Sequence, residues 1–162
     1  MLGPMSHSAV PKVVPLLVVR DAVRAVALYV QALGANEVTR YIDHRRGTIS
    51  HADLVIGRAV FSVTEEARRW NSDAPPSLGG SPVVLQLYVE DVGASFDRAR
   101  EAGATVVFPL VDFCGERMVR VRDPFGHLWI LIQRTEQLSP EETQDRRDAW
   151  APPATPRRHR RR

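Results

Sequence analysis

A small number of side chains in this 162-residue sequence have types and spacings that could do chemistry. His51 and Asp53 alternate along one predicted strand, so both project from the same face of it. They could act as metal ligands or as an acid–base pair, but no third partner lies nearby, and a solvated strand face is the favoured alternative. Cys114 could be a nucleophile, but no base can be assigned to it, and an ordinary loop thiol is favoured.

Arg120 and His127 are two further candidates in the second half of the sequence. A guanidinium can hold a carboxylate through two parallel hydrogen bonds, so Arg120 could bind an anionic ligand. The same side chain could instead pair with Asp53 or Glu116. His127 follows a turn sequence at residues 123–126, and capping of that turn is the favoured interpretation of its role.

The positive charge of the chain is concentrated in its last residues. Hydrophobic residues make up 44% and charged residues 25% of the sequence, and the pI is about 9.6. Five arginines lie within residues 157–162, and without them the formal net charge changes from +3 to −2. This tail could contact an acidic partner, but no aromatic or sheet platform accompanies it, so we do not expect nucleic acid as a partner.

The composition also bears on the compartment. A single cysteine, Cys114, excludes an internal disulfide and a thiolate zinc cluster. Apolar runs such as residues 13–19 are far shorter than the ~20 residues of a membrane span, so we expect no membrane partner. Residues 1–11 lack the pattern of a secretory signal. We therefore expect a cytoplasmic protein.

Hydrophobic periodicity and turn residues divide the chain into short strands and helices. Asp21 and Asp91 are predicted N-caps of two helices, which both end at a glycine. Ser139, with Glu142 three residues later, predicts the start of a C-terminal helix. The stretch 109–115 is predicted to be a loop. The predicted strands cover residues 13–19, 36–42, 48–56, 58–64, 83–89, 105–108, 117–122 and 127–133.

An internal repeat is the most informative pattern in the chain. Residues 14–21 align with residues 84–91, and Gly34-Ala35 aligns with Gly103-Ala104. Each half therefore predicts the order strand–helix–strand–strand–strand. Because such a unit has a helix on only one face of its sheet, its other face stays uncovered until a second unit meets it. We expect an α+β fold of two tandem βαβββ modules that form a cupped eight-stranded sheet with a central cleft.

Changes in composition mark the boundaries between these parts. Prolines and glycines within residues 75–80 break both helix and strand between the two modules, and proline and arginine dominate the end of the chain. We expect a flexible N-terminus at 1–11, a first βαβββ module at 12–65, a linker at 66–81, a second βαβββ module at 82–135, a C-terminal helix at 136–150 and a disordered Arg-rich tail at 151–162.

Three segments resemble the vicinal oxygen chelate superfamily, which includes glyoxalases, bleomycin-resistance proteins and extradiol dioxygenases. They are residues 17–22, 87–92 and 115–129, in the order and spacing of the small glyoxalase-like members. The resemblance covers about residues 12–135. It implies the paired βαβββ fold, and it implies a homodimer, because such small members commonly pair.

The metal site of that superfamily is not matched. Its metal-dependent members place one His, Gln or Glu on each of four pocket-facing strands. The matching positions here hold Val14, Ser62, Val84 and Ile130. Methyl groups cannot coordinate a metal and a neutral serine is a weak ligand, so we expect no standard metal site and no cofactor. A shift of one or two residues could bring in Gln86, but not a full ligand set.

The resemblance and strand alternation together assign the side chains that enter the cleft. The assigned positions are mainly apolar, which suits a small organic ligand, anionic or aromatic. Gln86 could alternatively make a structural hydrogen bond, and Tyr88 could belong to the core. The expected ligand-binding residues are Leu16, Ser62, Gln86, Tyr88, Met118, Arg120 and Ile130.

Three functions remain open from the sequence. The preferred one resembles the bleomycin-resistance branch: the cleft between the two modules binds a small organic molecule without the standard metal. The alternative is a divalent-metal-dependent lyase, isomerase or dioxygenase of the same superfamily with the non-standard ligands His51, Asp53 and Gln86. The third is an interaction module directed by the Arg-rich tail. The sequence assigns no catalytic residue and leaves open whether the protein is an enzyme.

Overall fold

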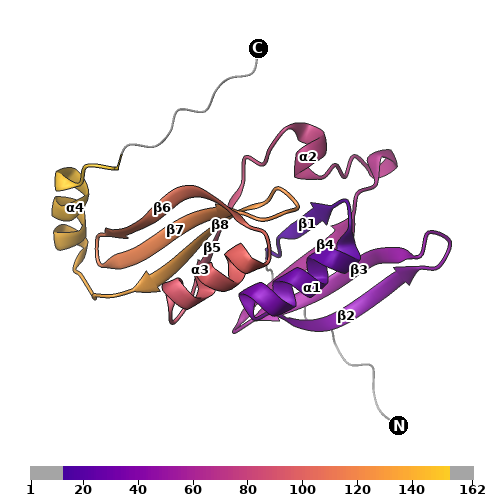
Figure 1. The fold of residues 1–162 in the computed structure, drawn as a ribbon, viewed down its shortest axis with the longest axis horizontal. Helices are drawn as coiled ribbons and strands as arrows, with labels where there is room; N and C mark the ends of the chain where they lie inside the picture. Colours follow the sequence, from indigo (N-terminus) through magenta and orange to yellow (C-terminus); the bar gives the residue numbers. More distant parts are fainter. Residues whose placement is uncertain (1–12, 154–162) are drawn as a thin grey trace, which may run out of the picture.

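The two halves of the chain form two similar units that lie next to each other in a computed structural model, which describes residues 13–153 (Figure 1). Both units have the order βαβββ, so the expected α+β class and the paired modules are confirmed. Hydrogen bonding divides the eight strands into two four-stranded sheets, ordered β1-β4-β3-β2 and β5-β8-β7-β6. The expectations for residues 1–11 and for most of the tail lie outside the described residues, and the module boundaries stay a prediction.

Short loops connect the strands and helices of each unit. The first unit comprises β1 (Leu16–Val19), α1 (Ala22–Leu33), β2 (Asn36–Asp43), β3 (Thr48–Ile56) and β4 (Ala59–Glu65). The second comprises β5 (Val84–Tyr88), α3 (Val92–Glu101), β6 (Thr105–Phe113), β7 (Glu116–Arg122) and β8 (Leu128–Arg134). Between the units lie the 3-10 helix η1 (Arg68–Trp70) and α2 (Pro75–Leu78), and α4 (Pro140–Ala149) follows the second unit.

The helix starts follow the predicted capping chemistry. The side chains of Asp21 and Asp91 accept hydrogen bonds from the backbone N–H groups of Arg24 and Ala94, each at 3.0 Å. At the start of α4, Ser139 and Glu142 form a reciprocal capping box. These local bonds satisfy N–H groups that a helix leaves without partners in its first turn, and they fix where each helix leaves its strand.

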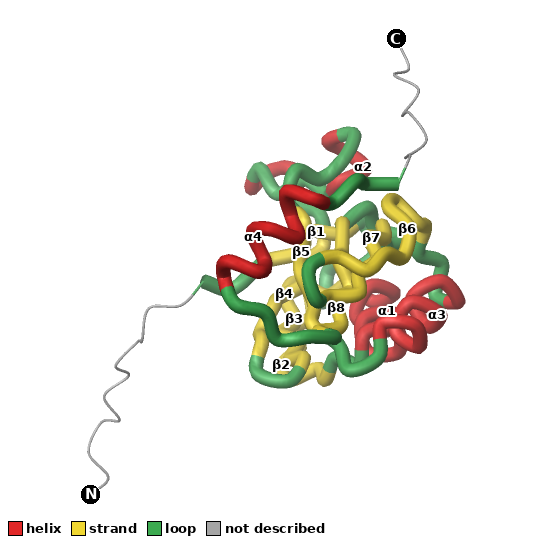
Figure 2. The backbone as a smooth tube through the Cα atoms, turned by 90° about the vertical axis from the view of Figure 1, so that its left-hand side faces the viewer, coloured by secondary structure: helices red, strands yellow, loops and turns green. Residues whose placement is uncertain are grey.

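One hydrophobic core spans both modules. Helices α1 and α3 lie side by side in both views (Figures 1 and 2). Between them and the sheets, the buried ring of Tyr29 contacts Phe61 of its own module and Trp129 of the other, with centroids 5.6 and 5.7 Å apart. The helix-facing side of each sheet is therefore covered, and the opposite side, here called the open face, is not covered by α1 or α3.

The buried carboxylate of Asp123 links the two modules. It accepts hydrogen bonds from the Tyr29 hydroxyl (2.8 Å) and the Trp129 indole N–H (2.9 Å), and from the backbone N–H groups of Phe125 and His127. Burial and the neighbouring negative charge raise the pKa of Tyr29 well above its usual range, so its hydroxyl stays a donor. The ring of His127 does not cap the turn: its Nε2 lies 3.0 Å from the Val18 carbonyl oxygen of β1.

One strand is longer than the sequence pattern predicts. Strand β6 runs from Thr105 to Phe113 and passes through Pro109, where a loop is expected. A proline removes a backbone donor, so it is tolerated in a sheet mainly on an edge strand. Strand β6 is the edge of the second sheet and its pairing with β7 shifts register on both sides of Phe108. The extension places Phe113 over the open face of the second sheet.

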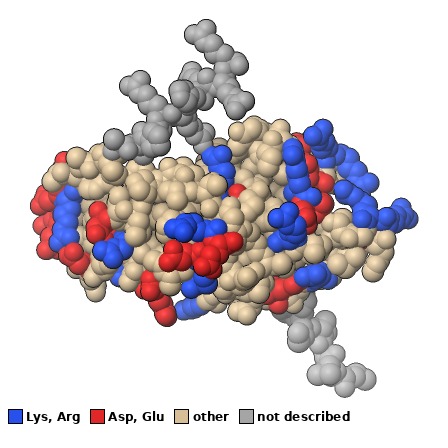
Figure 3. All heavy atoms as spheres, in the orientation of Figure 1, with Lys and Arg blue, Asp and Glu red and all other residues tan. Residues whose placement is uncertain are grey.

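Acidic and basic side chains are interspersed on the face of the molecule seen in Figure 3. Within the part of the chain that the structure describes, no helix combines the length and the apolar character needed to cross a bilayer.

Candidate functional site

A large pocket lies on the open face of the second sheet. Its volume is about 600 Å³, and strands β5, β7 and β8 form its floor. Alternation along the strands explains the floor: Leu87, Val119 and Leu131 point into the core, so their neighbours point out. The outward residues Gln86, Tyr88, Met118, Ile130 and Ile132 line this pocket.

The segment after β8 forms the outer wall of the pocket. Helix α4 stands at the outer end of the second module (Figures 1 and 2). Gly115, in the β6–β7 turn, anchors the approach to α4 because its carbonyl oxygen accepts hydrogen bonds from the N–H groups of Thr135 and Glu136, at 2.8 and 3.0 Å. Thr143 and Arg147 of α4 then line the pocket opposite the sheet residues.

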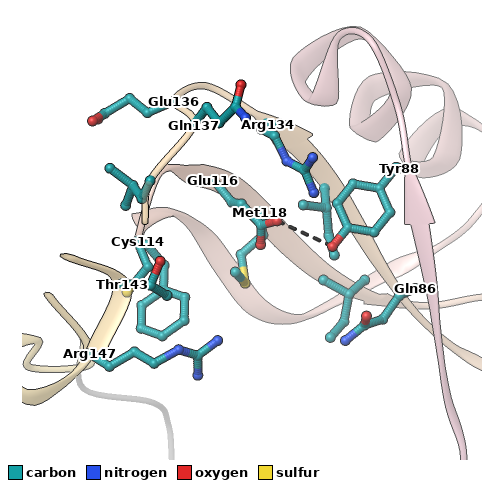
Figure 4. Close-up of a pocket in the computed structure, with 14 residues that line it drawn as sticks. Gln86, Tyr88, Cys114, Glu116, Met118, Arg134, Glu136, Gln137, Thr143 and Arg147 are labelled. Atoms are coloured by element: carbon teal, nitrogen blue, oxygen red, sulfur yellow. Dashed lines mark hydrogen bonds between the residues drawn. The ribbon is translucent and has the colours of Figure 1, made fainter. Parts of the chain in front are cut away.

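Two arginines that border this pocket contact aromatic rings and, among residues 13–153, have no acidic partner within 4.0 Å. The guanidinium of Arg134 lies 5.5 Å from the centre of the Tyr88 ring, and that of Arg147 lies 5.0 Å from the Phe113 ring. The Tyr88 hydroxyl donates a 3.2 Å hydrogen bond to Glu116 (Figure 4). Figure 4 shows Arg147 approaching from the α4 side and Gln86 from the β5 side.

A smaller aromatic pocket of about 260 Å³ continues from the first along the same face. Trp150, just after α4, packs edge to face on Phe113 with ring centroids 4.7 Å apart, and lies 6.4 Å from Phe108. Met118 and Ile130 line both pockets, and Arg120 lines only the smaller one. The two adjoining pockets, which share Met118 and Ile130, are together called the β5–α4 trough here.

The structure gathers five of the seven expected ligand-binding residues in the β5–α4 trough. In the second sheet, Gln86, Ile130 and Arg120 are direct neighbours across three strands. Tyr88, 53% exposed, and Met118 lie in the next row, each paired with Ile132. The other two residues, Leu16 and Ser62, are paired in the first sheet and do not line the trough.

A pocket between the modules is smaller than the trough. It has a volume of about 290 Å³ and is lined by β1, the linker, the start of β5 and His127, and it includes Leu16. Its lining contains no other residue from the expected set. The trough on the second module, not this space between the modules, therefore brings the expected residues together.

The open face of the first sheet carries a polar cluster around Asp53. Its carboxylate accepts hydrogen bonds from Ser62 (2.6 Å) and Thr39 (2.7 Å), and His51 Nε2 lies 3.0 Å from it. These bonds, led by that from Ser62, hold the pKa of Asp53 at about 2. A carboxylate so well stabilised as an anion is a poor proton acceptor near neutral pH. The buried Ser62 hydroxyl donates to this carboxylate and, among residues 13–153, does not contact a histidine that could act as its base.

The residues present do not fit the divalent metal of metal-dependent superfamily members. The positions that match its ligands hold three aliphatic side chains and Ser62, whose hydroxyl is bonded to Asp53. Over the described residues 13–153, no three His, Cys, Asp or Glu side chains cluster closely enough to hold an ion. Gln86 lines the trough, whereas neither His51 nor Asp53 does, so the alternative ligand set is not assembled there.

Sequence reasoning missed much of the trough wall. Phe113 was missed because Pro109 suggests a loop over residues 109–115, whereas β6 continues to Phe113. Arg147 belongs to α4 and Trp150 follows it directly. This helix has no buried residue and no apolar stripe, so the surface against which it packs could not be predicted from hydrophobic periodicity. The capping box at Ser139 was the available signal for the helix, but it carries no information about where the helix docks.

Two βαβββ units, each with its helix on one face of a four-stranded sheet, define the paired-module class of α+β proteins. The chain belongs to the Glyoxalase/Bleomycin resistance protein/Dioxygenase superfamily, whose family model matches residues 9–131. Uncharacterized proteins of Mycobacterium tuberculosis (strain H37Rv) and Mycobacterium bovis are each 40% identical to it over 144 residues. The matches cover 86% of this chain and 84% and 94% of those proteins, respectively.

Solved structures agree with this assignment. The crystal structure of TioX from Micromonospora sp. ML1 is similar with a TM-score of 0.60 and 31% identity, over 77% of this chain and 99% of that chain. The fosfomycin resistance protein FosX from Listeria monocytogenes, solved with Mn(II) and sulfate, is similar with a TM-score of 0.59 over 85% of this chain and 97% of that one. At 16% identity the second likeness shows the fold alone.

Proposed function

We propose that this protein binds a small organic molecule in the β5–α4 trough and does so without the metal of metal-dependent superfamily members. One observation carries the proposal: five residues expected to bind a ligand line two adjoining pockets, of which the larger measures about 600 Å³. That volume is within the range of pockets that enclose drug-sized ligands. The aliphatic residues at the metal-ligand positions favour binding over metal-assisted chemistry.

A screen of small aromatic and cationic compounds, read by thermal shift, tests this proposal. We expect at least one class of compound to raise the melting temperature of the wild-type protein, because a ligand that binds only the folded state stabilises it. The Gln86→Trp variant should lose this stabilisation, because the exposed Gln86 lies at the trough and an indole there fills the space.

Val38→Trp is the matched control, because it adds the same bulk at an exposed position on the edge strand β2 of the other sheet. It should keep the ligand-induced shift. If no compound stabilises the wild type, or if Gln86→Trp responds as fully as Val38→Trp, binding in the trough is wrong.

The proposal includes a homodimer in the cytoplasm. Exposed apolar side chains on the first module, among them Val23 and Val30 of α1 at 47% and 41% exposure, support self-association, because burying such surface is favourable. Light scattering coupled to size exclusion should then give twice the 18.1 kDa chain mass. A single species of chain mass at micromolar concentration would contradict the dimer, and cell fractionation tests the compartment.

A further inference from the structure

We propose that the ligand of the β5–α4 trough is an aromatic carboxylate, with its ring in the aromatic pocket and its carboxylate on Arg120. This inference rests on the proposed binding function and adds the chemical class of the ligand. It combines two independent observations: the aromatic side chains that line the smaller pocket, and the lack of an acidic partner for Arg120 among residues 13–153.

The wall of the smaller pocket favours a flat, unsaturated group. Phe108, Phe113 and Trp150 supply three ring systems, and the thioether of Met118 lines the same space. Aromatic rings prefer edge-to-face and offset contacts with other rings, and sulfur makes favourable contacts at ring edges. The volume of about 260 Å³ is below that of pockets for drug-sized ligands, so it suits a fragment of one or two rings.

Arg120 supplies the charge that selects an acid. It is partly buried, and within residues 13–153 it makes no side-chain hydrogen bond and no carboxylate lies within 4.0 Å of its guanidinium. The two acids that could have paired with it are engaged elsewhere: Glu116 with Tyr88, and Asp53 with Ser62 and Thr39. By contrast, Arg117, which lies earlier on the same strand β7, is paired with Asp112 at 2.8 Å.

The surroundings of Arg120 also favour an anion. Arg134 and Arg147, the other arginines of the trough, contact aromatic rings rather than carboxylates. Two acids line the larger pocket. Glu136 at the rim accepts a hydrogen bond from Arg146, and Glu116 on β7 accepts one from Tyr88.

Binding of three matched probes to the full-length protein tests the inference. They are 2-naphthoate, its neutral counterpart 2-naphthamide, and cyclohexanecarboxylate, which keeps the acid and lacks the aromatic ring. We expect 2-naphthoate to bind about tenfold to a hundredfold more tightly than 2-naphthamide by calorimetry, as for a hydrogen bond between charged groups in a partly buried site. Cyclohexanecarboxylate should also bind at least about tenfold more weakly than 2-naphthoate.

Two variants separate the roles of charge and ring. Arg120→Gln should reduce the preference for acid over amide to about twofold, and Arg58→Gln, at an exposed position in the β3–β4 turn, should leave it unchanged. Phe113→Leu should weaken 2-naphthoate about tenfold while cyclohexanecarboxylate changes little. Thermal unfolding of each variant checks that it is folded. If Arg120→Gln does not fold, Phe113→Leu still tests the inference.

The outcomes distinguish this inference from the function on which it rests. If 2-naphthamide binds as tightly as 2-naphthoate, or if Arg120→Gln keeps the preference for the acid, the assignment to aromatic carboxylates is overturned while binding in the trough stands. The same holds if none of the three probes binds at millimolar concentration but another compound binds and is blocked by Gln86→Trp. If no compound of any class binds, both proposals are overturned.

Discussion

Asp53 is the side chain on which the polar groups of the first sheet converge. Two hydroxyls donate to it and a histidine nitrogen lies at 3.0 Å, so its negative charge is stabilised in the folded state more than in the unfolded chain. Because its pKa in the folded protein is about 2, lower than its ordinary value of 3.8, it adds stability above about pH 4. This stability is lost as the pH falls toward 2.

Replacing Asp53 with asparagine should therefore lower the free energy of unfolding by about 1 kcal/mol at pH 7. The difference from wild type should shrink as the pH falls from about 4 to about 2, because the wild-type carboxylate becomes protonated there. Urea titrations at several pH values measure this. Asp145→Asn, at an exposed position on α4, is the control, and a difference that stays constant down to pH 2 would contradict the assigned cause.

The turn between β6 and β7 fixes the element that walls the trough. Gly115 has a backbone φ of +77°, in the left-handed region, and a Cβ built there would lie 3.2 Å from the Glu136 carbonyl oxygen and 3.1 Å from Leu138. The residue is therefore constrained both by its own conformation and by the segment that leads to α4. Gly57 in the β3–β4 turn has a similar φ of +57°, with no atom within 4 Å of such a Cβ.

Gly115→Ala should be more destabilising than Gly57→Ala. Both variants pay the cost of a left-handed alanine, about 1 kcal/mol, but only the first must also displace the approach to α4. We expect an additional loss of about 1 kcal/mol for Gly115→Ala in thermal unfolding followed by circular dichroism. Equal losses in the two variants would show that the anchoring contact contributes nothing.

The sequence predicts the positions of strands and helices better than it predicts how these elements pack against one another. Asp21, Asp91 and Ser139 act through local hydrogen bonds, and each was correctly predicted to cap a helix. Pro109 misled because its tolerance depends on β6 being an edge strand, which only the assembled sheet determines. Likewise, the candidate residues on β5, β7 and β8 followed from alternation and resemblance, whereas the α4 wall depends on contacts between distant segments.

The whole molecule is held as one unit by contacts that cross between the modules. Tyr29 from α1 donates to Asp123, which also accepts from Trp129, so a helix of the first module is bonded to the β7–β8 turn of the second. The same rings belong to a continuous buried cluster. Such a shared core favours a single cooperative unfolding transition rather than separate melting of two halves.

Tyr29→Phe should accordingly destabilise both modules together. The loss of a hydrogen bond to a buried carboxylate should cost about 1.5–3 kcal/mol. Native-state hydrogen exchange should show protection falling by the same factor in β3 and in β7, whereas Tyr41→Phe, on an exposed tyrosine, should change neither. A loss confined to the first module would contradict the coupling.

The packing of Trp150 on Phe113 has a practical consequence. An indole whose environment changes when a neighbouring space is filled is an intrinsic optical reporter, and Trp150 lines the aromatic pocket. The other two indoles are differently placed, since Trp70 is 71% exposed and Trp129 is buried in the shared core. Emission from Trp150 should therefore respond selectively to occupancy, so that the protein can serve as a label-free sensor in a search for its natural ligand.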